Sequence, residues 1–197
     1  MTNNEISEHT KSYLDCLSML ESNTGVLYRA LAERTTLPSI KAILLDVAAD
    51  SQKHAYLLRE VREKLTKSQE KPSDGAKIEE VFNITYEIFR EIIAKEELAS
   101  DELLNLSGKL DVLEKTLGEK YEYVQLKTQK LADKKLNPLH NVSLDNFGSL
   151  FARMINDGER HRELLENIKG IVEQNAQEIR STTFVSSASL NVSAQTA

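Results

Sequence analysis

A pattern of polar residues occurs twice in this chain, in the same order and within apolar segments of helical period. The pattern reads Glu-x6-Tyr and then, further along, Asp-x3-His-x2-Leu-Leu-x2-Val/Ile; its first copy begins at Glu21 and its second at Glu114. Either fragment alone is a weak signal. Two copies in one order, each on a pair of long helical segments, predict two equivalent halves built from the same helix pair.

The repeat places eight polar residues in matched positions. In the first half these are Glu21, Tyr28, Asp50 and His54, and in the second half Glu114, Tyr121, Asp157 and His161.

Breaks in the apolar periodicity delimit four long helices and one short one. A proline at residue 38 is well placed to open a helix, and the polar stretches 67–75 and 136–143 are typical of loops. The long helices are predicted at Ile6–Arg34, Ser39–Leu65, Asp101–Lys134 and Leu144–Ile179, and the short one at Ile78–Glu96.

These elements predict an all-α fold, a four-helix bundle whose short helix lies in a long crossover between the second and third long helices. Residues 1–180 form the predicted bundle domain. Residues 181–197 are rich in Ser, Thr and Ala and are predicted to be a flexible tail.

Composition narrows the classes of function. The net charge of -6 disfavours nucleic acid, because phosphate binding needs a clustered basic surface. A single cysteine excludes an internal disulfide and a four-thiolate iron centre. No apolar run approaches membrane-spanning length and the first residues do not resemble a signal peptide, so a cytoplasmic location is expected.

Helical phase predicts that both histidines point into the bundle. At about 100° per residue, His54 shares a stripe with the apolar residues of its helix, and His161 lies on an equivalent stripe. Glu21 falls on the apolar side of its helix, and Glu114 flanks the corresponding side of the third long helix. Carboxylates that face a core are costly unless they are paired or bind a metal, so the pattern itself indicates a polar site at mid-bundle.

The repeated pattern resembles the ferritin-like superfamily, particularly the bacterioferritin and rubrerythrin types of di-iron carboxylate protein. The resemblance spans the four long helices and not the tail. It implies that the metal ligands are Glu21, His54, Glu114 and His161, and that the supporting residues are Asp50, Asp157, Tyr28 and Tyr121. The implied cofactor is iron, with manganese or zinc as alternatives by ligand type.

Both copies depart from the family pattern at one position. The family has a bridging glutamate three residues before each histidine, where this chain has Ser51 and Gly158. Two glutamates neutralise one divalent ion and not two. A Glu2His2 set therefore suits a single ion, and a second ion would need an external bridging anion.

Two hypotheses follow from this departure. In the first, the chain is a ferritin-like metal-binding protein with a modified iron or manganese site for redox or metal-handling chemistry. In the second, it is a metal-free structural or interaction bundle in which the same residues form a buried polar network. Whether it is an enzyme stays open. A homo-oligomer, most simply a dimer, is expected, with no nucleic acid or membrane partner.

Overall fold

Residues 3–64, 79–133 and 144–193 are described by the computed structural model, and every regular element within these ranges is a helix. The elements are α1 (Asn3–Arg34), α2 (Pro38–Lys64), α3 (Glu79–Ile93), α4 (Ser100–Asp133) and α5 (Leu144–Ser193). The all-α prediction is confirmed, and the predicted helices begin and end within a few residues of those observed, except at the end of α5. The predicted loops 67–75 and 136–143 lie outside the described residues.

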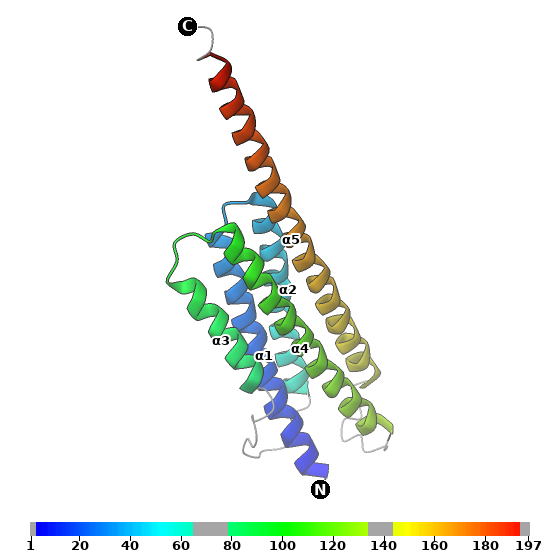
Figure 1. Ribbon diagram of the computed structural model, residues 1–197. Helices are drawn as coiled ribbons and strands as arrows, with labels where there is room; N and C mark the ends of the chain where they lie inside the picture. Colours follow the sequence, from blue (N-terminus) through cyan, green and yellow to red (C-terminus); the bar gives the residue numbers. More distant parts are fainter. Residues whose placement is uncertain (1–2, 65–78, 134–143, 194–197) are drawn as a thin grey trace.

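Two antiparallel helix pairs make up the bundle (Figure 1). α1 packs chiefly on α2 and α4 on α5, while α2 also contacts α5 and α3 lies against α1 and α4. α2 and α4 run in the same direction, and α3 carries the chain back along the outside of the bundle between them. This is the predicted crossover arrangement, and it brings the two copies of the repeat face to face.

The corner between α1 and α2 is tied to the connection between α3 and α4. Pro38 begins α2, where its missing N–H costs no helical hydrogen bond. Arg34 donates through Nε to the Lys95 carbonyl at 2.9 Å, and the Leu98 amide donates to the Arg34 carbonyl at 2.9 Å. These bonds fix the segment that follows α3 to the corner between α1 and α2.

The predicted stripes form the core. On α2 and α5, the apolar stripe residues are each exposed by 6% or less; they are Ile40, Leu44, Val47, Leu58, Val61, Phe147, Phe151, Met154, Leu165 and Ile168. His54 and His161 continue the two stripes and are each 2% exposed. The helical phase deduced from the sequence therefore places both imidazoles inside the bundle.

α5 is longer than the sequence predicts. The predicted end is Ile179, whereas the helix continues to Ser193 and projects past the ends of its neighbours (Figure 1). No Gly or Pro occurs after Gly170, so nothing in the sequence stops the helix although Ser and Thr favour it weakly. The division of the chain at residue 180 stays a prediction.

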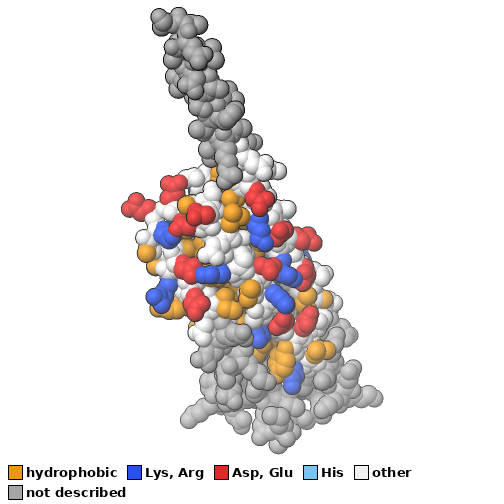
Figure 2. All heavy atoms as spheres, viewed as in Figure 1, with side chains coloured by type: hydrophobic (Ala, Val, Ile, Leu, Met, Phe, Trp, Pro, Cys, Tyr) orange, Lys and Arg blue, Asp and Glu red, His pale blue; other side chains and the backbone are white. Residues whose placement is uncertain are grey.

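Two surface properties, helix hydropathy and the distribution of charge on one face, can be stated for the part that the structure describes. None of the helices searched there is both long and apolar enough to cross a bilayer. On the face shown in Figure 2, acidic and basic side chains are interspersed, without a continuous basic patch.

Candidate metal centre

Four helices each contribute one predicted ligand to the middle of the bundle. Glu21 comes from α1, His54 from α2, Glu114 from α4 and His161 from α5, and each is 4% exposed or less. Glu114 is thus as fully inside as Glu21. The two imidazole rings lie 6.3 Å apart between centroids, so the two halves of the repeat meet at one place.

Within each half, a histidine faces a glutamate through the same ring nitrogen. His54 Nδ1 is 3.4 Å from Glu21 Oε1, and His161 Nδ1 is 3.1 Å from Glu114 Oε2. The two Nδ1 atoms and their carboxylates form the inner part of the site.

The aspartates cross over to the opposite half. His54 Nε2 is 3.0 Å from Asp157 Oδ2, and His161 Nε2 is 3.3 Å from Asp50 Oδ2. Each aspartate therefore orients the histidine of the other copy and not the histidine that follows it on its own helix. An outer carboxylate in this position fixes which ring nitrogen carries the proton.

The tyrosines cross over in the same way. Tyr28 donates its hydroxyl to Glu114 Oε1 at 2.7 Å, and Tyr121 donates its hydroxyl to Glu21 Oε1. Burial, followed by the nearby Glu114 charge, raises the pKa of Tyr28 well above its ordinary value, so this phenol stays a donor. All eight residues that the sequence singled out thus belong to one connected cluster.

Two cationic residues of the cluster were missed by the sequence analysis. Lys53 Nζ lies 2.5 Å from Asp50 Oδ1 and 3.4 Å from Asp157 Oδ2, between the two aspartates. Arg160 pairs with Asp50 and, at 2.8 Å, with Asp46. The signal was present in the repeat, because a basic residue immediately precedes the histidine in both copies.

Lys53 and the two histidines lower the pKa values of the aspartates and keep them ionised. Burial alone would raise the pKa of Asp50, but hydrogen bonds from Lys53 and His161 lower it to about 2. Burial is likewise outweighed at Asp157, where the His54 hydrogen bond and the Lys53 charge lower the pKa. Since an ionised carboxylate only accepts, each histidine Nε2 must be the donor.

In each half, this protonation pattern places two hydrogen-bond acceptors, the histidine Nδ1 and a glutamate oxygen, opposite each other. In a neutral imidazole with its proton on Nε2, Nδ1 is a lone pair, and in this site that lone pair faces a glutamate oxygen. Because the two lone pairs repel each other, a cation, either a proton or a metal ion, is needed between them. Without metal it is a proton: burial disfavours charged His54, but the hydrogen bonds and charges of Glu21 and Asp157 outweigh burial and raise the pKa of His54. Burial also raises the pKa of Glu21, in spite of its contact with His54.

The donor set also suits a divalent ion. Two ligands bound to one ion at about 2.1 Å lie roughly 3.0 Å apart at a right angle and roughly 3.4 Å apart at a tetrahedral angle. The nitrogen–oxygen separations of 3.1 and 3.4 Å in the two halves match this spacing. In addition, Glu21 Oε2 and Thr24 Oγ1, one turn apart on α1, are buried without a hydrogen-bond partner.

The histidine and carboxylate side chains of this cluster nevertheless contact one another in pairs. Among the described residues, no three or more His, Cys, Asp or Glu side chains are grouped so that they hold one ion together. Ser51 is 1% exposed and carries only a hydroxyl at the first replaced position. The second, Gly158, lines an open pocket of about 270 Å³ between α4 and α5.

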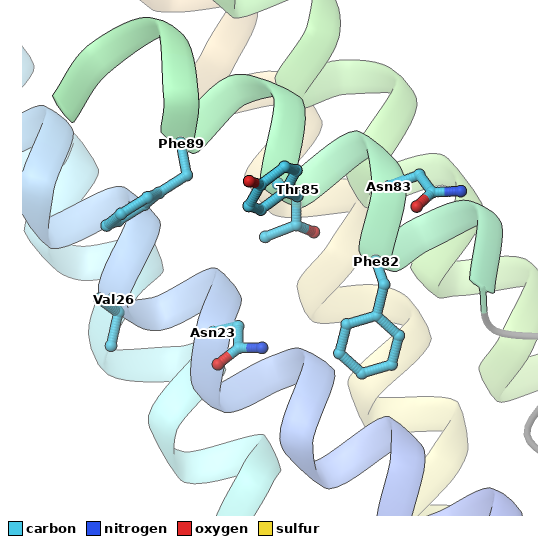
Figure 3. A pocket seen from close by; sticks show the side chains of 7 residues that line it. Asn23, Val26, Phe82, Asn83, Thr85 and Phe89 are labelled. Carbon is cyan, nitrogen blue, oxygen red and sulfur yellow. The ribbon is translucent and has the colours of Figure 1, made fainter. Parts of the chain in front are cut away.

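A larger hollow elsewhere has the wrong chemistry for a metal. It has a volume of about 420 Å³ and lies between α1 and α3 (Figure 3). Its lining contains no charged side chain and no histidine; the residues are Asn23, Val26, Phe82, Asn83, Thr85, Tyr86 and Phe89. The polar centre of the bundle is therefore the candidate site.

Comparison with known protein families gives a match. The sequence model of the family described as Rubrerythrin matches residues 18–133, which is more than half of the chain and includes α2, α3, α4 and about half of α1. No curated protein and no solved structure gives a match.

Proposed function

Because this chain belongs to the rubrerythrin family of the ferritin-like superfamily, we propose that its bundle binds one divalent metal ion between the Glu21–His54 and Glu114–His161 pairs. The family typically binds iron, and carboxylate with imidazole suits iron or manganese, with zinc as the alternative. We further propose that each chain binds one ion and not two.

The observation that carries the proposal is the pair of facing acceptors. Each histidine has its Nε2 committed to an ionised aspartate and its Nδ1 aimed at a glutamate oxygen at 3.1 or 3.4 Å. Hydrogen bonds to the aspartates thus keep the imidazole proton on Nε2 and leave both Nδ1 lone pairs available to a cation. A site that needed only apolar packing would not bury two glutamates opposite two imidazoles.

Charge balance supports a single ion. The inner part of the cluster holds four carboxylates, from Glu21, Glu114, Asp50 and Asp157, and two permanent cations, Lys53 and Arg160. Asp46, the other partner of Arg160, lies exposed at the surface. With both imidazoles neutral, two negative charges remain uncompensated. One divalent ion neutralises them, and so do two imidazolium protons, so metal and protons compete for the same place.

A bound iron or manganese ion would supply electron transfer to a small oxidant or a holding place for the ion itself. Around it, the tyrosines hold the glutamate oxygens, the aspartates fix the imidazole tautomer and the apolar stripes above and below exclude water. A redox or metal-handling role is consistent with these parts.

The proposal is tested by anaerobic titration of metal-free protein with Fe(II), Mn(II) and Zn(II), with the number of bound ions read by calorimetry. The expected result is one ion per chain, lost in the His54→Ala/His161→Ala variant and kept in a Tyr56→Ala variant, which changes an exposed residue of α2. Two ions per chain would overturn the single-ion claim, and no binding would overturn the metal site.

A metal-free structural role is the second candidate, and a specific observation favours it. Among the described residues the polar groups are already satisfied in pairs, apart from Glu21 Oε2 and Thr24 Oγ1, and no group of three holds an ion. In that case the histidine variant loses stability while neither protein binds metal, which separates the two functions.

A further inference from the structure

A pocket on one side of the bundle leads to the polar centre. It lies between α4 and α5 and has a volume of about 270 Å³. Glu114, itself only 4% exposed, forms part of its lining, and Glu114 Oε2 is the atom 3.1 Å from His161 Nδ1. The pocket therefore runs from solvent to a residue of the candidate site.

Two glycines line this pocket. Gly118 is on α4, one turn after Glu114, and Gly158 is on α5, at the position of the replaced glutamate. A Cβ added to either would meet nothing within 4 Å. Both glycines therefore face open space, and a larger side chain at either position would extend into the pocket.

The matched place in the other half is closed. Gly25 follows Glu21 by the same four residues, but a Cβ there would lie 2.5 Å from Gln52 Nε2 and 3.1 Å from the Ala48 carbonyl oxygen. Gln52 is held over Gly25 because its Nε2 donates to the Ser22 carbonyl at 3.0 Å. The first copy of the repeat is therefore closed at Gly25 by the Gln52 side chain, whereas the second copy has an open pocket at Gly118.

The residue that plugs one side is replaced by a charge on the other. The position matched to Gln52 is Glu159, whose side chain is 67% exposed and turns outward to Arg162 at 3.3 Å. The pocket lining carries four carboxylates and two cations; these are Glu114, Glu119, Glu122, Glu159, Lys115 and Arg162. Glu114 is the buried inner end, so the mouth carries three carboxylates and two cations, a net charge of minus one, which attracts cations and repels anions.

We propose that the Gly118–Gly158 pocket is the entrance through which a divalent cation reaches the polar centre, and that Gln52 closes the equivalent route. The inference rests on the proposed metal site and adds how that site is reached. An entrance changes the rates of binding and release together and leaves the equilibrium unchanged.

The test is stopped-flow binding of Co(II) to the metal-free full-length chain, followed by its visible absorption, with an equilibrium titration beside it. In Gly118→Leu we expect association and dissociation to slow together by about tenfold or more, with the dissociation constant little changed. The matched control is Gly108→Leu, the same exchange on the same helix, where an added Cβ also meets nothing within 4 Å. Equal rates in Gly118→Leu and Gly108→Leu would overturn the entrance.

A second variant moves the rates in the opposite direction. Gln52→Ala removes the side chain that lies over Gly25 and leaves only the Ala48 carbonyl there, so both rates should rise above those of the unaltered chain. Glu159→Gln should slow association most at low ionic strength, because the attraction of the mouth for cations is screened by salt. If Gln52→Ala leaves both rates unchanged, the closed side is not controlled by this residue and the one-sided entrance is overturned.

A metal-independent measurement separates this inference from the metal site. If the unaltered chain binds no Co(II), the proposed function fails, and the entrance is judged on water access in the metal-free protein. Exchange of the His161 ring C2 proton for deuterium, read by mass spectrometry, should be slower in Gly118→Leu than in Gly108→Leu. Equal exchange rates would overturn the entrance independently of any metal.

Discussion

At the scale of single residues, each half of the candidate site is held by groups from the other half. Tyr28 on α1 serves Glu114 on α4, and Asp157 on α5 serves His54 on α2. The symmetry-related contacts repeat this exchange. The site therefore forms only when the two helix hairpins dock, although each hairpin carries its own glutamate and histidine.

Removal of one tyrosine hydroxyl should cost stability. In Tyr28→Phe, Glu114 Oε1 loses its hydrogen bond inside the core, and we expect a loss of about 1–3 kcal/mol in the free energy of unfolding. Urea unfolding of the metal-free protein measures it. The control is Tyr56→Phe, because Tyr56 is 56% exposed and should change stability by much less. Equal effects of the two variants would contradict the hydrogen-bonded role of Tyr28.

Removal of one outer carboxylate should weaken metal binding without removing a ligand. In Asp157→Asn, His54 Nε2 is no longer held by a charge, and we expect the affinity for a divalent ion to fall about 10–100-fold. Competition titration against a chelator measures the affinity. Asp46→Asn is the matched control, since Asp46 contacts Arg160 and neither histidine. A similar loss in both variants would point to general charge and not to imidazole orientation.

The residues of the site were predictable from sequence, but their partners were not. The helical phase of His54 and Glu21 follows from the apolar stripes, because burial dictates which face turns inward. Whether Asp50 bonds the histidine of its own copy or the other depends on the register between α2 and α5, and a single helical pattern carries no information on that register. Lys53 and Arg160 were overlooked because long cationic side chains on a helix are ordinarily solvated.

At the scale of helices, the proposed number of ions rests on the two replaced positions. Ser51 on α2 and Gly158 on α5 occupy the places where the family has bridging glutamates, and they leave the cluster two carboxylates short. A Cβ at Gly158 would meet nothing within 4 Å, so α5 has room for a longer side chain there.

Restoration of the two carboxylates should raise the metal stoichiometry. In Ser51→Glu/Gly158→Glu, two further negative charges are added, which two divalent ions balance better than one. Calorimetric titration with Fe(II) under anaerobic conditions should give two ions per chain in place of one. The control is Gly148→Glu, which is also on α5 and where an added Cβ also meets nothing within 4 Å; it should leave the stoichiometry at one ion per chain. An unchanged stoichiometry in the double variant would mean that these positions do not limit the site.

Helix ends were predicted well where a residue stops or starts a helix and poorly where none does. Pro38 begins α2 as expected, whereas α5 passes its predicted end at Ile179. Val172 is the last buried side chain along α5 among those described. Ser and Thr in the last residues suggested a tail, but weak propensity alone does not end a helix.

At the scale of the whole molecule, the candidate site needs residues from both halves of the bundle, including α5. The family match covers residues 18–133, which include Glu21, His54 and Glu114, but His161 comes from α5 beyond it. The four-helix bundle as a whole, and not the matched segment alone, is therefore the unit that forms the polar centre.

Stability of the metal-free bundle should fall as pH rises above neutrality. His54 and His161 have raised pKa values in the folded state because of their carboxylate partners, which outweigh burial. Their contribution is complete below the unfolded histidine pKa of about 6.5 and is lost as pH rises through the folded values. The lowered pKa of Asp50, about 2, acts oppositely and is lost only as pH falls from roughly 4 toward that value.

Urea unfolding at pH 6 and pH 8 checks this direction. We expect lower stability at pH 8 in the metal-free protein and a flatter dependence in His54→Gln/His161→Gln. Metal should reverse the trend, because the ion requires both imidazoles to be neutral and binds more tightly at higher pH. Rising stability of the metal-free protein between pH 6 and pH 8 would show that the histidines carry no proton there.

The most direct test of the central claim is the metal content of the protein as purified without chelator, measured by elemental analysis beside the His54→Ala/His161→Ala variant. The proposed single-ion site predicts about one iron, manganese or zinc ion per chain, absent from the variant. Metal absent from both proteins, even after anaerobic loading with Fe(II), would contradict the claim and leave the buried cluster as a structural network.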